Sequence, residues 1–398
     1  MKKYTLILVL ICTLSLAKAQ ENDTTSYTNL EAIFTRPFVL NGQAGNVNTA
    51  IGGYLEGNTN YFSTDGVSDG FSMEMRRFNI FLYASLHERV KFISELEFEH
   101  GTEEIALETA LIDFEINPAL VFRMGILLPP VGYFNQNHDG PKWDFINRPL
   151  VSTTIIPATL SEIGMGFYGK IPFRRNIFTY EAYLVNGLQD GIITNETNRT
   201  LLAAGKSEEM FAEDNNGTPS LTGRVALKNK AMGEVGLSGY TGVYNTFKLD
   251  GMMIDEKRRA SLVALDYNGG FGELTVLGEA AFSYVDVPES YGQQFGSDQV
   301  GMHLDLIYPI KKGRIFSWNG MTLNAIFRFE YVDYNKGDFE ETNGNIFDDI
   351  LAVVPGLSLR FSKNTLLKAN YRRHWERDIL GNPAVKTAGF QFGFASYF

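Results

Sequence analysis

The chain has 398 residues, a formal net charge of −11 at pH 7 and a single cysteine, Cys12. The acidic balance argues against a nucleic-acid partner, and a lone cysteine excludes an internal disulfide and a zinc–thiolate site. Hydrophobic residues make up 44% of the chain, yet no apolar run after Leu16 is long enough to cross a bilayer as a helix.

The first residues predict export. Lys2 and Lys3 precede an apolar run over 6–16, and small residues follow at 17 and 19, so we predict a signal peptide over residues 1–19. Residues 20–46 are polar and then rich in asparagine and glycine. We predict that they form a periplasmic leader, followed by an outer-membrane barrel over residues 47–398.

Alternation of apolar and polar residues begins near Val47 and predicts sixteen strands. In the last one, Phe390, Phe392, Phe394 and Phe398 share one face, as on the lipid-facing side of a barrel strand. The predicted strands cover 47–62, 71–87, 89–100, 105–116, 120–128, 162–172, 176–187, 220–229, 233–244, 258–267, 271–285, 298–309, 320–334, 349–362, 365–377 and 386–398. We therefore predict an all-β fold, a transmembrane antiparallel β-barrel of about sixteen strands, with fourteen or eighteen left open and a large soluble β-sandwich or β-helix as the alternative.

The connectors alternate between short and long, as tight periplasmic turns and long outer loops do in such barrels. Short turns are predicted near 87–88, 117–119, 173–175, 229–230, 268–270 and 363–364, and a longer one at 309–319. Among the long connectors, 188–219 is acidic and is predicted to be a plain surface loop. A barrel of about sixteen strands encloses a water-filled channel, so the strand count predicts a pore.

The connector 129–161 is long and unusually apolar for a solvated loop. We predict that it folds into the barrel and narrows the lumen; an outer lid or a subunit contact is the alternative. The polar residues that it would bring to the constriction are His138, Asp139, Lys142, Asp144 and Arg148.

Several predicted strands carry charge on their inferred lumen face, where opposed charges select permeants by sign. These lumen-lining candidates are Lys91, Glu95, Glu97, Glu99, Asp113, Arg224, Arg328, Arg360, Lys368 and Arg372. Arg123 is a further candidate for permeant binding, with an ion pair to Asp113 as the structural alternative. The signs are mixed and do not fix the selectivity.

No catalytic motif accompanies the five histidines, and no histidine pair lies at helical spacing for a metal. We predict no enzyme activity, no cofactor and no metal site. An outer-membrane lipid hydrolase, with a serine near His303 or His374, is the enzymatic alternative.

The segment 123–166 carries a set of motifs that resembles one family. It contains Arg-x-Gly at 123–125, Pro-Pro-Val-Gly at 129–132, Asn-Arg-Pro-Leu at 147–150 and Glu-Ile-Gly-Met-Gly at 162–166. Together with Arg76-Arg77 and the acidic strand 95–99, this pattern is similar to the phosphate-selective porin O and P family over roughly 50–190. The dense lysine cluster of the phosphate-selective members is missing.

This resemblance implies a trimeric sixteen-stranded pore whose inward loop draws anions such as phosphate, with Arg123, Lys142 and Arg148 at the constriction. We therefore expect an outer-membrane porin for passive diffusion of small hydrophilic solutes, surrounded by outer-membrane lipid. The alternatives are a general or carbohydrate channel, which Tyr133, Phe134 and Trp143 would favour by stacking on sugars, and a non-conducting structural or secretion-associated barrel.

Overall fold

The computed structural model describes residues 27–38, 40–44 and 47–398. The predicted signal peptide lies outside these residues, and the predicted leader is described only in part. Among the described residues, no helix is both long and apolar enough to cross a membrane.

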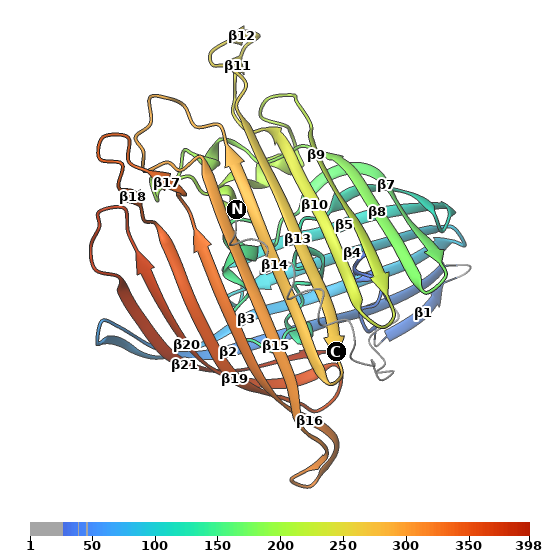
Figure 1. Ribbon diagram of the computed structural model, residues 1–398. Coiled ribbons are helices and arrows are strands. Elements are labelled where there is room, and N and C mark those ends of the chain that lie inside the picture. Colours follow the sequence, from blue (N-terminus) through green and yellow to red (C-terminus); the bar gives the residue numbers. More distant parts are fainter. Residues whose placement is uncertain (1–26, 39, 45–46) are drawn as a thin grey trace.

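Sixteen antiparallel strands form a closed barrel, as predicted (Figure 1). They are β2 (Val47–Thr64), β3 (Val67–His87), β4 (Val90–Glu99), β5 (Glu104–Asn117), β6 (Leu120–Leu127), β7 (Glu162–Phe173), β8 (Asn176–Val185), β9 (Ser220–Asn229), β10 (Gly233–Val243), β13 (Arg259–Phe271), β14 (Leu274–Val285), β15 (Asp298–Ile315), β16 (Trp318–Asp333), β19 (Asp349–Arg360), β20 (Thr365–Arg377) and β21 (Val385–Tyr397). Pairing of β2 with β21, from Tyr54 opposite Tyr397 to Thr64 opposite Thr387, closes the ring.

The wall is apolar outside and polar inside, which is the reverse of a soluble sheet. In β9, Leu221, Val225 and Leu227 are about half exposed, while Arg224 on the other face is 3% exposed. Lipid therefore faces the apolar positions, and the polar positions line the interior.

Short strands outside the ring complete the sheet structure. β1 (Leu40–Ala44) pairs with the first residues of β2. Two small hairpins, β11 (Lys248–Leu249) with β12 (Met252–Met253) and β17 (Gly337–Asp338) with β18 (Asn345–Ile346), lie in the long loops at the upper end of the barrel (Figure 1).

Two predicted turns were misplaced. The turn after β13 lies at 272–273, where Gly272 adopts a positive φ of 63°, and not at 268–270. The predicted connector 309–319 is mostly strand, because β15 continues to Ile315 and β16 starts at Trp318. Register shifts between Pro309 and Lys311 and between Gly313 and Ile315 interrupt the alternation of apolar and polar residues there. The alternation therefore did not predict this long hairpin.

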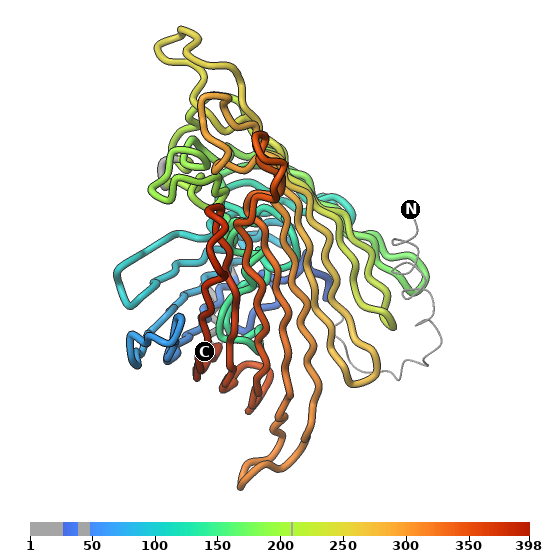
Figure 2. The backbone as a smooth tube through the Cα atoms, turned by 60° about the vertical axis from the view of Figure 1, so that its left-hand side comes forward, coloured from blue at the N-terminus to red at the C-terminus, as the bar shows by residue number. Residues whose placement is uncertain are grey.

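The connector between β6 and β7 folds into the barrel, as predicted (Figure 2). We call residues 128–161 the inward loop; it contains η2 (Asn135–Asn137), η3 (Gly140–Lys142) and α2 (Leu150–Thr154). On one side the Gly132 amide donates to Ser238 Oγ of β10 at 2.8 Å, and on the other the Ile146 amide donates to Asn370 Oδ1 of β20 at 3.2 Å. The loop thus bridges distant parts of the wall.

The connector 188–219 was predicted to be a plain surface loop, and this prediction is wrong. It forms η4 (Asp190–Ile192), η5 (Leu202–Gly205) and η6 (Glu208–Phe211). Its Leu188, Ile192, Leu202 and Met210 are buried in one apolar cluster with Val151 of the inward loop. These apolar side chains are separated by polar and acidic residues in the sequence, so the segment resembles a solvated loop. In the structure they pack against the inward loop.

Residues 27–38, which we call the N-terminal strap, also contact the interior face of the wall, an arrangement that the sequence did not predict. The strap begins with η1 (Asn29–Glu31). The Asn29 amide donates to Glu234 of β10 at 3.0 Å, Lys170 of β7 contacts Glu31 at 2.8 Å, and Arg36 reaches Glu95 of β4 at 2.8 Å. The strap therefore connects the part of the wall between β4 and β10 across the interior.

Candidate functional site

Arg123 lies on β6 and is tied to the wall. Its Nε and Nη2 donate to the two carboxylate oxygens of Asp113 at 2.8 and 2.9 Å, and Tyr168 donates to the same carboxylate at 2.6 Å. The Arg123 residue is 2% exposed. This is the bidentate ion pair that stood as the alternative to permeant binding.

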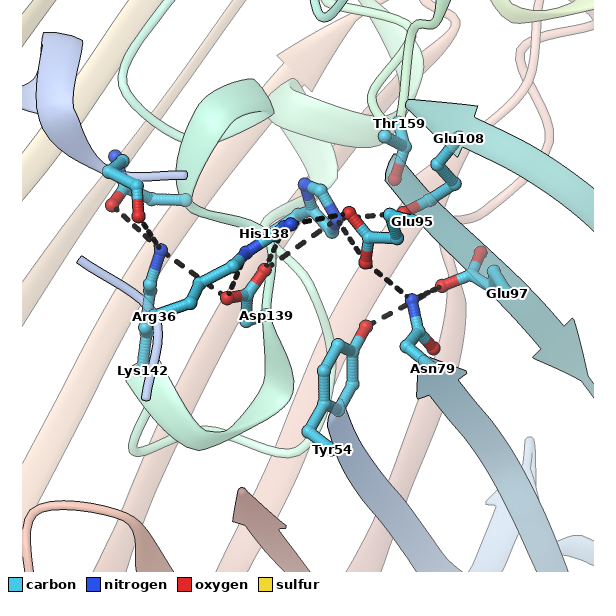
Figure 3. A network of polar contacts seen from close by, with 12 residues as sticks. Arg36, Tyr54, Asn79, Glu95, Glu97, Glu108, His138, Asp139, Lys142 and Thr159 are labelled. Atoms are coloured by element: carbon cyan, nitrogen blue, oxygen red, sulfur yellow. Dashed lines mark hydrogen bonds and ion pairs between the residues drawn. The ribbon is translucent and has the colours of Figure 1, made fainter. Parts of the chain in front are cut away.

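His138 and Asp139 sit at the centre of a buried polar network that joins the inward loop, the strap and the wall (Figure 3). Arg36 of the strap donates to both oxygens of Asp139 at 2.9 and 2.7 Å. His138 Nε2 lies 3.0 Å from Glu108 Oε2 of β5. These contacts lock the loop and the strap to each other and to the wall.

The loop residues in this network have shifted ionisation. Burial opposes protonation of His138, but the adjacent Glu108 and then Glu95 outweigh it and raise the pKa of His138 to about 10. Burial lowers the pKa of Lys142, and Asp139, 3.4 Å away, offsets only part of that effect. Because its pKa is about 10, the His138 side chain is protonated at neutral pH when no metal ion is bound beside it.

Asp144 holds the far side of the inward loop. Its carboxylate accepts from Arg360 Nη2 at 2.8 Å and from the Ser358 hydroxyl, both on β19. Lys368 of β20 donates to the backbone oxygens of Gly140 and Phe145 at 2.9 and 3.0 Å. These two anchors position the loop, and neither leaves a free charge for a permeant.

Arg148 differs from the other loop candidates. Its Nη1 donates to Thr159 Oγ1 at 3.0 Å, but its Nε and Nη2 have no hydrogen-bond partner among the described residues. Within the described part of the chain, Arg148 also forms no ion pair with a carboxylate closer than 4.0 Å. Arg148 thus has no direct ion-pair partner in the described part of the chain, and Glu97 and Glu108 act on it only over a longer distance.

A cavity of about 400 Å³ lies beside Arg148 and has a strongly basic lining. Arg76, Arg77, Arg148, Arg372 and His374 contribute to it, with Asn147, Leu150, Thr153 and Ile350 completing the wall. No carboxylate belongs to this set, although three of the arginines reach acids outside it. Arg76 contacts Glu74 at 3.3 Å, Arg77 contacts Glu56 at 3.1 Å and Arg372 contacts Glu330 at 2.6 Å.

A second cavity, of about 440 Å³, adjoins the first through Arg77, Arg148 and Thr153. Its other charged lining residues are Glu97, Glu99, Glu104, Glu108 and Lys206. A basic chamber therefore lies next to an acidic one on either side of Arg148, and this arrangement produces a transverse field.

The predicted lumen charges are mostly paired, either with a strand one or two positions away in the ring or with the inward loop. Arg224 contacts Asp266 at 2.6 Å, and Arg328 contacts Asp305 at 2.6 Å. The remaining pairs are Lys91 with Glu115, Arg77 with Glu97 and Glu99, Arg123 with Asp113, Arg360 with Asp144, and Arg372 with Glu330. Paired charges line the interior without giving it one overall sign.

Two β-bulges explain site residues that alternation alone misses. Glu56 lies opposite Arg77 and Gly57 opposite Met75, so Arg76 is an extra residue in β3. Likewise Glu95 lies opposite Thr109 and Leu96 opposite Leu107, so Glu108 is an extra residue in β5. A bulge lets two successive side chains face the same side; the adjacent arginines at 76–77 were the available signal.

The structure does not favour sugar stacking at Trp143 and Phe134 or a lipid hydrolase at His303. Trp143 is 6% exposed and packs on Phe134 with centroids 4.6 Å apart, so neither ring offers a face to a sugar. His303 is buried, and its two ring nitrogens have no hydrogen-bond partner in the described part of the chain. A serine hydroxyl activated by His303 is therefore not present in this arrangement.

Comparison of the sequence with known proteins gives one partial match. No known family profile matches the sequence. An uncharacterized protein of Aquifex aeolicus (strain VF5) is 35% identical over 147 residues, which cover 35% of this chain and 32% of that protein. The match thus spans about a third of that relative's length, and it assigns no activity.

Solved structures resemble the barrel over most of its length. The anion-selective porin from Comamonas acidovorans has a TM-score of 0.55 at 12% identity, covering 89% of this chain and 100% of that one. The trimer form of Vibrio cholerae OmpT gives 0.55 at 12%, covering 88% and 99%. Pseudomonas putida OprB gives 0.51 at 9%, covering 88% and 94%. The chain therefore has the fold of outer-membrane barrels, and none of these likenesses supports the narrower resemblance to the phosphate-selective O and P family.

Proposed function

We propose that this chain is an outer-membrane porin that passes small anions by passive diffusion, without catalysis. The observation that carries the proposal is the arginine-lined cavity beside the inward loop. Guanidinium groups bind carboxylate and phosphate oxygens with two parallel hydrogen bonds, so the cavity suits small oxyanions, phosphate among them.

Charge balance around this cavity favours anions over cations. The chain as a whole is acidic, but selectivity depends on the charges next to the permeation path. Three cavity arginines have direct carboxylate partners, whereas Arg148 has no direct ion-pair partner among the described residues, so Arg148 is the cavity arginine that a carboxylate neutralises least. The solved porin of similar fold that is described as anion-selective is consistent with this proposal.

The remaining expectations belong to the same proposal. Export by residues 1–19 would deliver the chain, and residues 20–46 would follow as a leader before the barrel. Assembly as a homotrimer in outer-membrane lipid is supported by the trimer form of a protein with the same fold.

The proposal is tested by the reversal potential of the purified protein in a planar bilayer under a salt gradient, repeated with added phosphate. We expect anion selectivity. Removing one charge near a permeating ion changes its energy by about 1 kcal/mol, so Arg148→Ala should lower the anion-to-cation permeability ratio about fivefold. Arg175→Ala, in the exposed turn between β7 and β8, is the matched control and should leave the ratio unchanged.

Other results would either refine the proposal or contradict it. Cation selectivity of the wild type would overturn anion preference while keeping a porin. Block by phosphate at low concentration would point to phosphate as a preferred anion. Absence of any conductance in a folded, heat-modifiable protein would favour a non-conducting barrel.

A further inference from the structure

Three side chains from three segments converge on one point in the interior: Glu95 of β4, Glu108 of β5 and His138 of the inward loop (Figure 3). One oxygen or nitrogen of each lies within 4.8 Å of the others, and all three residues are buried. His138 Nε2 is 3.0 Å from Glu108 and 3.7 Å from Glu95 Oε1. We propose that these three residues bind one divalent transition-metal ion that fastens the inward loop to the wall.

The histidine is oriented as a metal ligand would be. Its Nδ1 lies 2.8 Å from the backbone oxygen of Asn135, a partner that can only accept a hydrogen bond. In the neutral ring the proton therefore resides on Nδ1, and the lone pair of Nε2 points at the two glutamates. A backbone carbonyl on the second ring nitrogen is the usual outer support of a metal-bound histidine.

Glu95 is oriented by the same kind of support. Asn79 Nδ2 donates to Glu95 Oε1 at 2.7 Å, and Arg36 contacts the other oxygen, Oε2, at 2.8 Å. Arg36 thus pairs with the second oxygen of this carboxylate, and its guanidinium also contacts Asp139 Oδ1, which lies 3.7 Å from His138 Nε2. The oxygen on the His138 side remains able to bind an ion, and Asn79 fixes its direction.

A buried hydroxyl without a hydrogen-bond partner in the described part of the chain lies on the same interior face as Glu95. Thr109 is fully buried, and its Oγ1 has no hydrogen-bond partner among the residues that the structure describes. Thr109 lies directly opposite Glu95 in the ladder, and side chains of directly opposed residues share one face of a sheet. The bulge at Glu108 places both successive residues of β5 in the interior, which is how bulges redirect side chains toward functional sites.

The local charges leave room for a cation. The buried acids of this network are Glu95, Glu97, Glu108 and Asp139, and the permanent cations that contact the loop side of it are Arg36 and Lys142. Arg77 reaches Glu97 at 3.5 Å but is shared with Glu56 and Glu99. The carboxylates of this network thus outnumber the cations that contact them directly, which favours the binding of a cation beside Glu95 and Glu108.

The donor set indicates the class of ion. One imidazole nitrogen and two carboxylates suit zinc, manganese or ferrous iron better than calcium or magnesium, which prefer oxygen ligands alone. The position also gives the ion a role: it would join the loop to β4 and β5 at the level of the acidic chamber, where Glu108 also lines the cavity.

The test uses the full barrel purified in detergent, stripped with EDTA and titrated with zinc alone. We expect one zinc ion per chain by elemental analysis and a rise in thermal unfolding temperature on binding. His138→Gln and Glu108→Gln should weaken zinc binding by about 100-fold or more. His303→Gln, which alters another buried histidine far from the triad in the sequence, is the control and should bind zinc as the wild type does.

Retention of wild-type zinc affinity in both triad variants, or absence of stoichiometric binding in the wild type, would overturn the proposal. If a variant does not fold, cobalt binding to the wild type decides the question. Intense visible bands of a four- or five-coordinate nitrogen–oxygen site would uphold the triad, and the weak spectrum of hydrated cobalt would overturn it. None of these readouts depends on conductance, so the result stands apart from the proposed porin function.

Discussion

The barrel wall and its contents are built on different principles. In the wall, each strand pairs with the next strand of the ring over a continuous ladder, and large apolar side chains are exposed along the outside. Inside, the contacts are single and distant in sequence: Arg36 meets Asp139, and Ile146 meets Asn370. A wall made of many equivalent pairings should tolerate local change, whereas an interior held by few charged contacts should not.

The largest expected effect comes from removing the interior while keeping the wall. Replacing residues 131–157 with a short Gly-Ser linker should leave a folded barrel, because the ladders of the wall do not pass through the loop. Single-channel conductance should rise several-fold, since a sixteen-stranded barrel otherwise encloses an open channel. A variant that no longer shows a heat-modifiable gel shift would mean that wall and interior fold as one unit.

Next in size is the loss of a single interior contact. Arg36→Ala leaves the buried carboxylates of Glu95 and Asp139 without their guanidinium, and breaking a buried pair on one side costs about 3 kcal/mol or more. The measurement is the urea midpoint in detergent, together with protease cleavage of the strap. An unchanged midpoint with an intact strap would show that the strap does not depend on this residue.

A contact at the seam of the wall should matter less. The ring of Phe398 stacks on Phe78 with centroids 5.4 Å apart and an interplanar angle of 11°. Such pairs contribute about 1 kcal/mol beyond their buried area, so Phe398→Ala should lower the urea midpoint modestly. Phe316→Ala, at the exposed tip of the β15–β16 hairpin, provides the aromatic control that should have no effect.

The smallest effect tests burial directly. Lys312 contacts Glu273 at 2.8 Å, the same distance as Arg36 to Glu95, but both Lys312 and Glu273 side chains are about half exposed. Exposed pairs contribute about 0.5 kcal/mol or less. Lys312→Ala should therefore leave the urea midpoint nearly unchanged, and a loss comparable to that of Arg36→Ala would refute burial as the reason for the difference.

The same division decides what the sequence could predict. Alternation in stretches such as Leu323 to Tyr331 identified the wall, because lipid outside and water inside impose a strict period of two. The apolar residues of 129–161 also predicted that this loop turns inward. These features depend on local pattern, which one sequence contains.

The partners inside the barrel could not be predicted in this way. Nothing in the polar segment before residue 39 signals that Arg36 would meet Asp139, since that contact joins residues 103 positions apart. The bulges at Arg76 and Glu108 shift the following side chains by one position. Strict alternation therefore assigns these two residues to the wrong face of the wall. Paired charges also look like free ones in a sequence, so Arg148 could not be distinguished from Arg123 or Lys142.

The seam between β2 and β21 has a consequence for how the barrel assembles. Every other pairing in the ring joins strands that are neighbours along the chain, and these hairpins can form early because little chain entropy is lost in closing them. The seam joins the first and last strands of the ring and can form only when all the hairpins have come together in the correct tilt. We therefore expect closure of this seam to limit the rate of folding, because β2 and β21 remain unpaired edges until it occurs.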